Sequence, residues 1–251
     1  RAVGQVDDAD VGEVFDEPAD PSIRTAGFLG AGRPLRAYFP REAKAGPVIV
    51  YMHGGGWVIG DLDTHNALCT MIASVSGLRV VAVDYRLAPE NPFPAAHEDC
   101  LAATRFVAGS PAELGEPVTG IAVAGDSAGG NLAFYVGAKM GGEELLGQLL
   151  IYPAGDCTSP DEGAYKEFED GFLLDRRLMD RFIRDYLPDE RQAAHPDVSP
   201  LLHPFPPGVP PAVILTAGLD PLRDQGRDLA GHIAAQGVEV HYIEAEGLIH
   251  G

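Results

Sequence analysis

The stretch Gly120 to Met140 reads GIAVAGDSAGGNLAFYVGAKM: an apolar strand-like run, a serine flanked by glycines, and a helix-like run from Asn131. Ser127 is the centre of the pattern Gly-x-Ser-x-Gly, where the strand passes into the helix. A serine at such a turn takes a strained backbone conformation, and its neighbours must be small for strand and helix to approach. A plain glycine turn shares the pattern but explains this strand-turn-helix context less well. We therefore predict that Ser127 is a nucleophile.

Apolar runs of the same kind recur along the chain, with helix-like segments between them. Besides Gly120–Gly125, the predicted strands are Pro47–Met52, Leu78–Val83, Gln148–Tyr152, Ala212–Ala217 and Val238–Ile243. Strands that are joined by helices form largely parallel sheets buried on both faces, so the pattern predicts an α/β fold. Ligands of such sheets bind at the carboxyl ends of the strands, and we expect the chemistry there.

The spacing of apolar residues predicts a helix over Thr64–Ser76. Its cap is expected to be Asp63 or Thr64, because side chains of this kind accept hydrogen bonds from the first free backbone N–H groups. Gly77 is expected to end it, since glycine readily takes the left-handed conformation of a helix end. This helix would cover one face of the sheet.

A second predicted helix spans Asp175–Leu187 and ends before Pro188, which cannot continue a helix. It lies in an insertion, residues 158–211, that separates two strands and closes with a proline-dense stretch. Insertions of this length are usually functional lids. Closer to the N-terminus, Ser22–Phe39 has the pattern of a hairpin.

Composition excludes several classes of protein. A chain of 251 residues is long enough to bury most of its surface around one core. No stretch approaches eighteen uninterrupted apolar residues, so no membrane contact is expected. Acidic residues outnumber basic ones by 37 to 18, which argues against nucleic acid as a partner. The three cysteines, Cys69, Cys100 and Cys157, form no Cys-x-x-Cys pair. Their spacing argues against a disulfide scaffold or a zinc site and favours a reducing, cytoplasmic location.

A second informative motif, His53-Gly54-Gly55-Gly56-Trp57, directly follows the strand Pro47–Met52. Consecutive glycines let backbone N–H groups point at one spot, as the oxyanion of a tetrahedral intermediate requires. Such a loop could instead bind phosphate. However, the Gly-Lys-Ser/Thr ending of phosphate-binding loops is missing, and no second glycine-rich site has dinucleotide-binding spacing.

With these two motifs the chain resembles the hormone-sensitive-lipase-like esterases, the bacterial family IV branch of the α/β-hydrolase superfamily. Further segments match the family in order: Tyr85-Arg86-Leu87-Ala88-Pro89-Glu90, Ser199-Pro200-Leu201, Asp220-Pro221-Leu222-Arg223-Asp224 and Gly247-Leu248-Ile249-His250-Gly251. The resemblance implies an α/β-hydrolase fold, with a mostly parallel central sheet, flanking helices and a helical cap.

The resemblance also implies the site residues. In the superfamily an acid and then a histidine follow the nucleophile along the chain, and Asp220 and His250 occupy the matching positions. They would complete a Ser-His-Asp triad with Ser127, in which His250 is the base and Asp220 orients it. No cofactor or metal would be needed. The implied oxyanion-hole donors are the N–H groups of Gly54, Gly55 and Ala128. Asp126 and His53 also match the family pattern and would shape the loops.

Several residues compete with these assignments. Asp224 follows Asp220 by four residues, but it is expected in the first turn of a helix, where a carboxylate complements the helix dipole. The competing histidines are placed less well, within a helix, within a strand or in the insertion: His232, His241, His195 and His203.

The resemblance implies a single domain over residues 1–251, with a cap built from about residues 1–40 and 158–211. Family members continue past the His-Gly with a final helix, which this chain is expected to lack. Because members often pair through the last strand and that helix, a homodimer is a possible assembly.

The expected activity is hydrolysis of short-chain acyl esters, by a carboxylesterase acting on a small-molecule substrate. An amidase, lactonase or deacetylase would use the same triad, because the shape of the pocket decides the substrate. A non-catalytic ligand-binding receptor of this fold is the alternative from another class. Such receptors have the catalytic histidine replaced, so His250 counts against that alternative.

Overall fold

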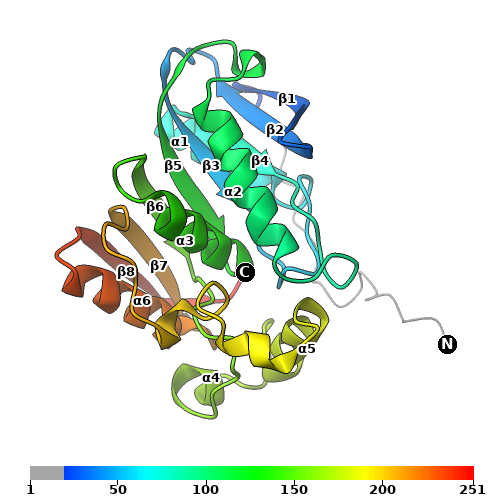
Figure 1. Cartoon of the computed structure of the whole chain (residues 1–251), viewed down its shortest axis with the longest axis vertical. Helices are drawn as coiled ribbons and strands as arrows, with labels where there is room; N and C mark the ends of the chain where they lie inside the picture. Colours follow the sequence, from blue (N-terminus) through cyan, green and yellow to red (C-terminus); the bar gives the residue numbers. More distant parts are fainter. Residues whose placement is uncertain (1–19) are drawn as a thin grey trace.

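The computed structural model describes residues 20–251, in which an eight-stranded sheet is flanked by helices (Figure 1). The strands are β1 (Ile23–Gly30), β2 (Arg33–Pro40), β3 (Gly46–Met52), β4 (Arg79–Val83), β5 (Val118–Asp126), β6 (Leu145–Ile151), β7 (Ala212–Leu219) and β8 (Val240–Ile249). The α-helices are α1 (Asn66–Ser76), α2 (Ala95–Ala108), α3 (Ala128–Met140), α4 (Gly163–Glu167), α5 (Arg176–Tyr186) and α6 (Arg223–Ala235). Short 3-10 turns occupy Ala112–Leu114, Glu190–Ala194 and Pro200–Leu202.

The order of strands across the sheet is β1-β2-β4-β3-β5-β6-β7-β8. Six neighbouring strands pair in parallel: β4, β3, β5, β6, β7 and β8. Strands β1 and β2 add an antiparallel edge. This is the predicted α/β architecture, so the expected fold class is confirmed. Parallel neighbours bring the carboxyl ends of β3, β5, β7 and β8 to the same edge of the sheet, where ligands of such folds bind.

Side chains that alternate along each strand fill two separate apolar layers. On β3, Val50 packs in the layer covered by α2, α3 and α6, together with Leu132 and Leu229. The next residue, Tyr51, points to the opposite face, where Cys69 of α1 covers it. All of these side chains are at most 1% exposed. Strand β3 is therefore packed on both faces, which fixes the loop at its carboxyl end.

The predicted helices and strands are all present, with shifted ends. Helix α1 ends at Gly77, in the predicted left-handed conformation (φ 67°), but His65 is its N-cap rather than Asp63 or Thr64. The predicted strand Val238–Ile243 extends to Ile249, because β8 is the exposed edge of the sheet and tolerates the polar residues that follow. As a result His250 directly follows the strand.

The N-terminal hairpin is confirmed, but its place differs from the one expected. Strands β1 and β2 pair from Ile23↔Pro40 to Gly30↔Arg33, and β2 pairs with β4, so residues 23–40 belong to the edge of the sheet. The expectation that residues 1–40 contribute to a cap is wrong for this part, because β2 carries buried apolar side chains that complete the sheet. Residues 1–19 lie outside the described residues.

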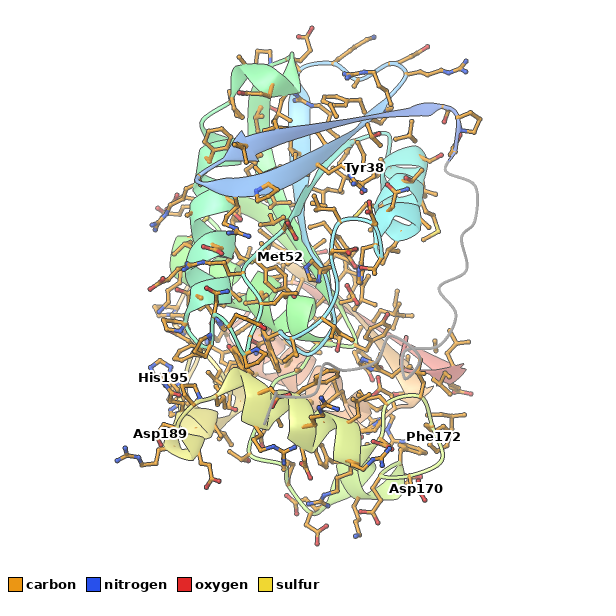
Figure 2. All side chains as sticks on the ribbon, turned by 90° about the vertical axis from the view of Figure 1, so that its right-hand side faces the viewer. Tyr38, Met52, Asp170, Phe172, Asp189 and His195 are labelled. Atoms are coloured by element: carbon orange, nitrogen blue, oxygen red, sulfur yellow. The ribbon has the colours of Figure 1, made fainter. Side chains whose placement is uncertain are left out.

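The insertion, residues 158–211, contains α4 and α5 and lies beyond the carboxyl ends of the strands (Figure 1). Figure 2 shows Asp170, Phe172 and Asp189 of this segment at the end of the molecule opposite Tyr38 of β2. The N-cap of helix α5 is Asp175, whose side chain accepts a hydrogen bond from Leu178 N–H, and the helix ends before Pro188 as predicted. No helix within residues 20–251 is long and apolar enough to cross a membrane.

Candidate active site

Ser127 occupies the sharp turn between β5 and α3, with φ 53° and ψ −120°. A left-handed backbone at a non-glycine residue is unfavourable by about 1–3 kcal/mol and persists only where neighbouring contacts impose it. Those contacts are backbone hydrogen bonds. Ser127 N–H donates to Ile151 O (2.8 Å), and Ser127 O accepts from Ala154 N–H (3.2 Å) and Asn131 N–H (3.1 Å).

Small residues on both sides of Ser127 are required by the packing of this turn. A Cβ on Gly125 would collide with the backbone oxygen of Gly129, and a Cβ on Gly129 would collide with that of Met52. Any larger residue would push α3 away from β3 and β5. The two glycines of the pattern Gly-x-Ser-x-Gly therefore let the helix start close to the sheet, as the sequence predicts.

Asp220 and His250 meet Ser127 at the carboxyl edge of the sheet. Asp220 directly follows β7 and His250 directly follows β8. His250 Nε2 lies 2.9 Å from Ser127 Oγ, and His250 Nδ1 lies 2.7 Å from Asp220 Oδ2. Asp220 is fully buried, and its other oxygen accepts a hydrogen bond from Leu222 N–H (2.8 Å). With Nδ1–H donated to Asp220, Nε2 is free to accept the serine proton.

The competing residues are engaged elsewhere. Asp224 is in the first turn of α6, as expected, and its carboxylate binds Ala164 N–H, Arg223 and Arg227. His232 Nδ1 lies 2.8 Å from Asp228 O within α6, and His241 pairs with Glu239 on the exposed edge of the sheet. The other two, in the insertion, contact backbone groups there: His195 with Asp197 N–H and His203 with Ala194 O.

The glycine motif lies beside the serine turn, but one of its predicted donors is occupied. Gly54 N–H donates to Asp126 Oδ1 (2.9 Å), so it is not available to the oxygen of a tetrahedral intermediate at Ser127. The prediction of Gly54 as an oxyanion donor is therefore wrong. Gly56 and Ala128 line the same cavity as Ser127. Within the described residues, the N–H groups of Gly55 and Gly56 donate to no protein acceptor.

Asp126 joins the glycine motif to the serine turn, the loop-shaping role expected for it. It is buried and accepts hydrogen bonds from Tyr51 Oη–H (2.6 Å), Gly54 N–H and His65 Nε2 (3.3 Å). Burial alone would raise the pKa of Asp126, but the hydrogen bonds from His65 and Tyr51 outweigh it and hold the pKa below its usual range. Sequence reasoning missed Tyr51 and His65, because nothing in the spacing shows that they face this carboxylate.

Two buried histidines have pKa values below the usual range of the imidazole. Burial lowers the pKa of His53, in the glycine motif, and of His97, in α2, to about 4 each. His97 is held neutral between Tyr186 Oη (3.2 Å from Nδ1) and Asp197 O (3.0 Å from Nε2). In the unfolded chain both would titrate near 6.5, so only the unfolded state gains these protons between pH 6.5 and about 4.

We expect the free energy of unfolding to fall by roughly 1.4 kcal/mol per pH unit for each of these histidines as the pH drops through that window. Urea unfolding of the wild type and of His97→Gln at pH 7.5, 6 and 5 measures the effect. Glutamine keeps a hydrogen-bonding group but does not titrate, so the variant should lose less stability per pH unit. Equal slopes in the two proteins would contradict the assignment to His97.

A small cavity of about 40 Å³ opens beside Ser127 Oγ. Most of its lining side chains are apolar, and the insertion supplies several of them, including Met179 and Phe182 of α5. Phe182 packs so closely on Gly56 that a Cβ there would collide with its ring. Trp57 stacks on Tyr186 at the end of α5, with ring centroids 4.3 Å apart. Helix α5 therefore encloses both the serine and the glycine motif.

Comparison with known families gives a match over most of the chain. The family profile of the alpha/beta hydrolase fold matches residues 49–251, a span that begins in β3 and includes Ser127, Asp220 and His250. The chain belongs to this family. The resemblance to hormone-sensitive-lipase-like esterases is thereby confirmed. Within residues 20–251, no group of three or more His, Cys, Asp or Glu side chains is arranged to hold a metal ion.

Relatives within the family are named as ester hydrolases. Carboxylesterase NlhH of Mycobacterium tuberculosis is 41% identical over 238 residues, which are 91% of this chain and 74% of that protein. Ethyl acetate hydrolase of Pseudomonas putida is 36% identical over 247 residues, or 94% and 76% of the two chains. The solved structure of a Pyrobaculum calidifontis esterase matches with a TM-score of 0.86 at 38% identity, covering 95% of this chain and 80% of that one. The chain is thus a member of a family of serine carboxylic ester hydrolases.

Proposed function

We propose that this protein hydrolyses short-chain acyl esters by a Ser-His-Asp acyl-enzyme mechanism. The observation that carries the proposal is the pair of hydrogen bonds made by His250, one to Ser127 Oγ and one to Asp220 Oδ2. A serine hydroxyl alone is a weak nucleophile and needs an adjacent base that is held in the correct tautomer. His250 is the base, and Asp220 holds it.

In the first half of the reaction, Ser127 Oγ attacks the ester carbonyl carbon while His250 Nε2 takes the serine proton. The C–O bond to the alcohol then breaks, and His250 gives that proton to the leaving alkoxide. In the second half a water molecule attacks the acyl-serine, with His250 again accepting and returning one proton. The acid leaves and Ser127 is regenerated. Asp220 stays ionised and stabilises the imidazolium each time it forms.

The oxyanion that forms in both halves is bound by backbone N–H groups. We assign Gly55, Gly56 and Ala128, in place of the set that included Gly54. The occupied Gly54 N–H supports the change, as does the position of Gly56 and Ala128 beside Ser127. Ala128 is the first residue of α3, so its N–H has no partner within the helix. Donors of this kind are each worth about a hundred- to a thousand-fold in kcat.

The size and lining of the cavity support short acyl groups as the substrate. A volume of about 40 Å³, walled mostly by apolar side chains, suits an acetyl methyl group. No metal or cofactor takes part in the proposed steps. Cys69, Cys100 and Cys157 are free and buried, which suits the reducing, cytoplasmic location expected from the sequence.

A chain-length series of p-nitrophenyl esters, from acetate to palmitate, tests the proposed substrate class. We expect kcat/KM to be highest for acetate or butyrate and lower by about a hundred-fold or more for palmitate, because an acyl chain that does not fit an apolar pocket is rejected by factors of this size. A profile that rises with chain length would contradict the short-chain assignment. Hydrolysis of p-nitroacetanilide faster than the acetate ester would favour an amidase instead.

A further inference from the structure

The motif Asp220-Pro221-Leu222-Arg223-Asp224 supplies the acid of the proposed triad, yet its last two side chains bind the insertion. The Asp224 carboxylate accepts a hydrogen bond from Ala164 N–H of α4, with an N···Oδ2 distance of 2.7 Å. The Arg223 guanidinium pairs with Glu167 at the other end of α4, with Nη2 and Oε2 3.1 Å apart. Arg223 Nε also binds Asp224 Oδ1 (3.0 Å), which joins the two side chains into one group.

Helix α4 depends on this group because it has little stability of its own. It contains five residues, far fewer than an isolated helix needs, and its N-cap residue Glu162 makes no side-chain cap. Gly163 has φ 56°, and a Cβ there would lie 2.8 Å from Asp224 Oδ2, so the first turn of α4 sits directly against the carboxylate. After the last turn, the Phe168 ring lies 5.1 Å below the Arg223 guanidinium.

The charges needed for this contact are present at neutral pH. Burial alone would raise the pKa of Asp224, but the hydrogen bonds from Arg223 and from Ala164 N–H outweigh it and hold the pKa below its usual range. Hydrogen bonds to ionised groups are roughly twice as strong as those between neutral groups. Asp224 therefore serves α4 as a strong acceptor.

The residue that α4 presents to the active site is Tyr165. Its side chain is 3% exposed and lines the cavity beside Ser127, together with Leu222 of the same motif that holds α4. The Tyr165 hydroxyl donates to Ser159 Oγ (3.2 Å), so the ring is fixed within the insertion. Any displacement of α4 from α6 would move this wall of the cavity.

We propose that Arg223 and Asp224 are positioning residues that set the acyl-chain selectivity of the enzyme, by holding α4 and thus Tyr165 against the cavity. The inference rests on the proposed function, because it concerns the cavity beside Ser127. The motif from Asp220 to Asp224 then has two functions. Asp220 holds the base, while Arg223 and Asp224 hold the wall that limits the length of the acyl group.

The test compares wild type, Asp224→Ala, Asp224→Asn and Asp228→Ala on p-nitrophenyl acetate, butyrate and hexanoate. We expect Asp224→Ala to raise KM for acetate about ten-fold, the effect typical of losing a hydrogen bond to a charged group, with kcat within about two-fold of wild type. The hexanoate-to-acetate ratio of kcat/KM should rise by a similar factor. Asp224→Asn keeps an oxygen that can accept from Ala164 N–H, so its KM and its hexanoate-to-acetate ratio should lie between those of wild type and Asp224→Ala. Asp228 is an exposed carboxylate one turn further along α6, and its variant should match wild type.

A double-mutant cycle tests whether the effect passes through Tyr165. Tyr165→Ala should itself raise the hexanoate-to-acetate ratio, and adding Asp224→Ala should change that ratio little further, because both variants remove the same wall. If Asp224→Ala is poorly folded, Gly163→Ala disturbs the same contact from the α4 side and should shift the ratio in the same direction.

Two results would overturn the inference: an unchanged chain-length profile in folded Asp224→Ala and Gly163→Ala, or an equal loss of kcat on all three esters. The second result would mean that Asp224 acts on the triad rather than on the wall. Failure of the proposed function is distinguishable, since it would leave wild-type ester hydrolysis insensitive to Ser127→Ala.

Discussion

Replacing Ser127 with alanine is expected to lower kcat for p-nitrophenyl acetate by about a million-fold, the loss typical of removing the nucleophile of a Ser-His-Asp triad. No other hydroxyl can replace it, because the hydrogen bond from Ser127 Oγ to His250 Nε2 is the route by which the proton leaves. Initial rates at saturating ester measure the effect. Purification in parallel with wild type excludes hydrolysis by a contaminant.

The control for this prediction is Ser74→Ala. Ser74 is an exposed serine on α1, and its hydroxyl donates a hydrogen bond to Asp20 Oδ2. Its variant should hydrolyse the ester at the wild-type rate. Thermal unfolding should show that Ser127→Ala is folded, since alanine occupies the same backbone conformation without new side-chain atoms. A folded Ser127→Ala protein with the wild-type rate would place the nucleophile elsewhere.

Asp220→Asn is expected to lower kcat by about ten thousand-fold, because an asparagine amide favours the wrong tautomer of the histidine. In the wild type the Asp220 carboxylate accepts a hydrogen bond from His250 Nδ1–H, with Nδ1 and Oδ2 2.7 Å apart. An amide that donates to Nδ1 would leave the proton on Nε2, which then could not accept the proton of Ser127. The same chain-length assay, at saturating acetate ester, measures the loss. Urea unfolding reports whether the buried amide also destabilises the fold.

Asp224→Asn provides the comparison within the same motif. Since Asp224 binds α4 rather than His250, its variant should retain kcat within an order of magnitude of wild type and differ mainly in KM. A large loss of kcat in Asp224→Asn together with a small loss in Asp220→Asn would reverse the assignment of the acid. The two variants thus separate residues that sequence spacing leaves as rivals.

Sequence reasoning predicted the features that depend on local pattern and chain order. The turn at Ser127 follows from a run of small residues between a strand and a helix, and packing against Met52 explains why those residues must be small. Asp220 and His250 directly follow neighbouring parallel strands, which explains why residues far apart in sequence meet at one edge. Family motif positions were enough to place both.

The features that could not be predicted depend on the direction of single groups in three dimensions. The sequence alone does not distinguish Gly54 from Gly56, because both belong to one run of glycines. The Asp126 carboxylate distinguishes them, since it accepts the hydrogen bond of Gly54 N–H. The contact of Asp224 with Ala164 joins residues 60 positions apart through a backbone N–H, which has no signal in side-chain type. The prediction also missed the last residues of β8, from Glu244 to Ile249. An exposed edge strand tolerates polar residues, so this part carries no apolar pattern.

The hairpin of β1 and β2 lies at the end of the molecule opposite the insertion (Figure 2). Its tip, Ala31-Gly32, is exposed and turns with φ 52° and 78°, so neither residue contributes to the core. Exposed loop tips tolerate attachments and insertions well. A surface anchor or fluorescent label joined at this tip would leave the mouth of the cavity open to solvent, which suits the protein to immobilisation on a solid support.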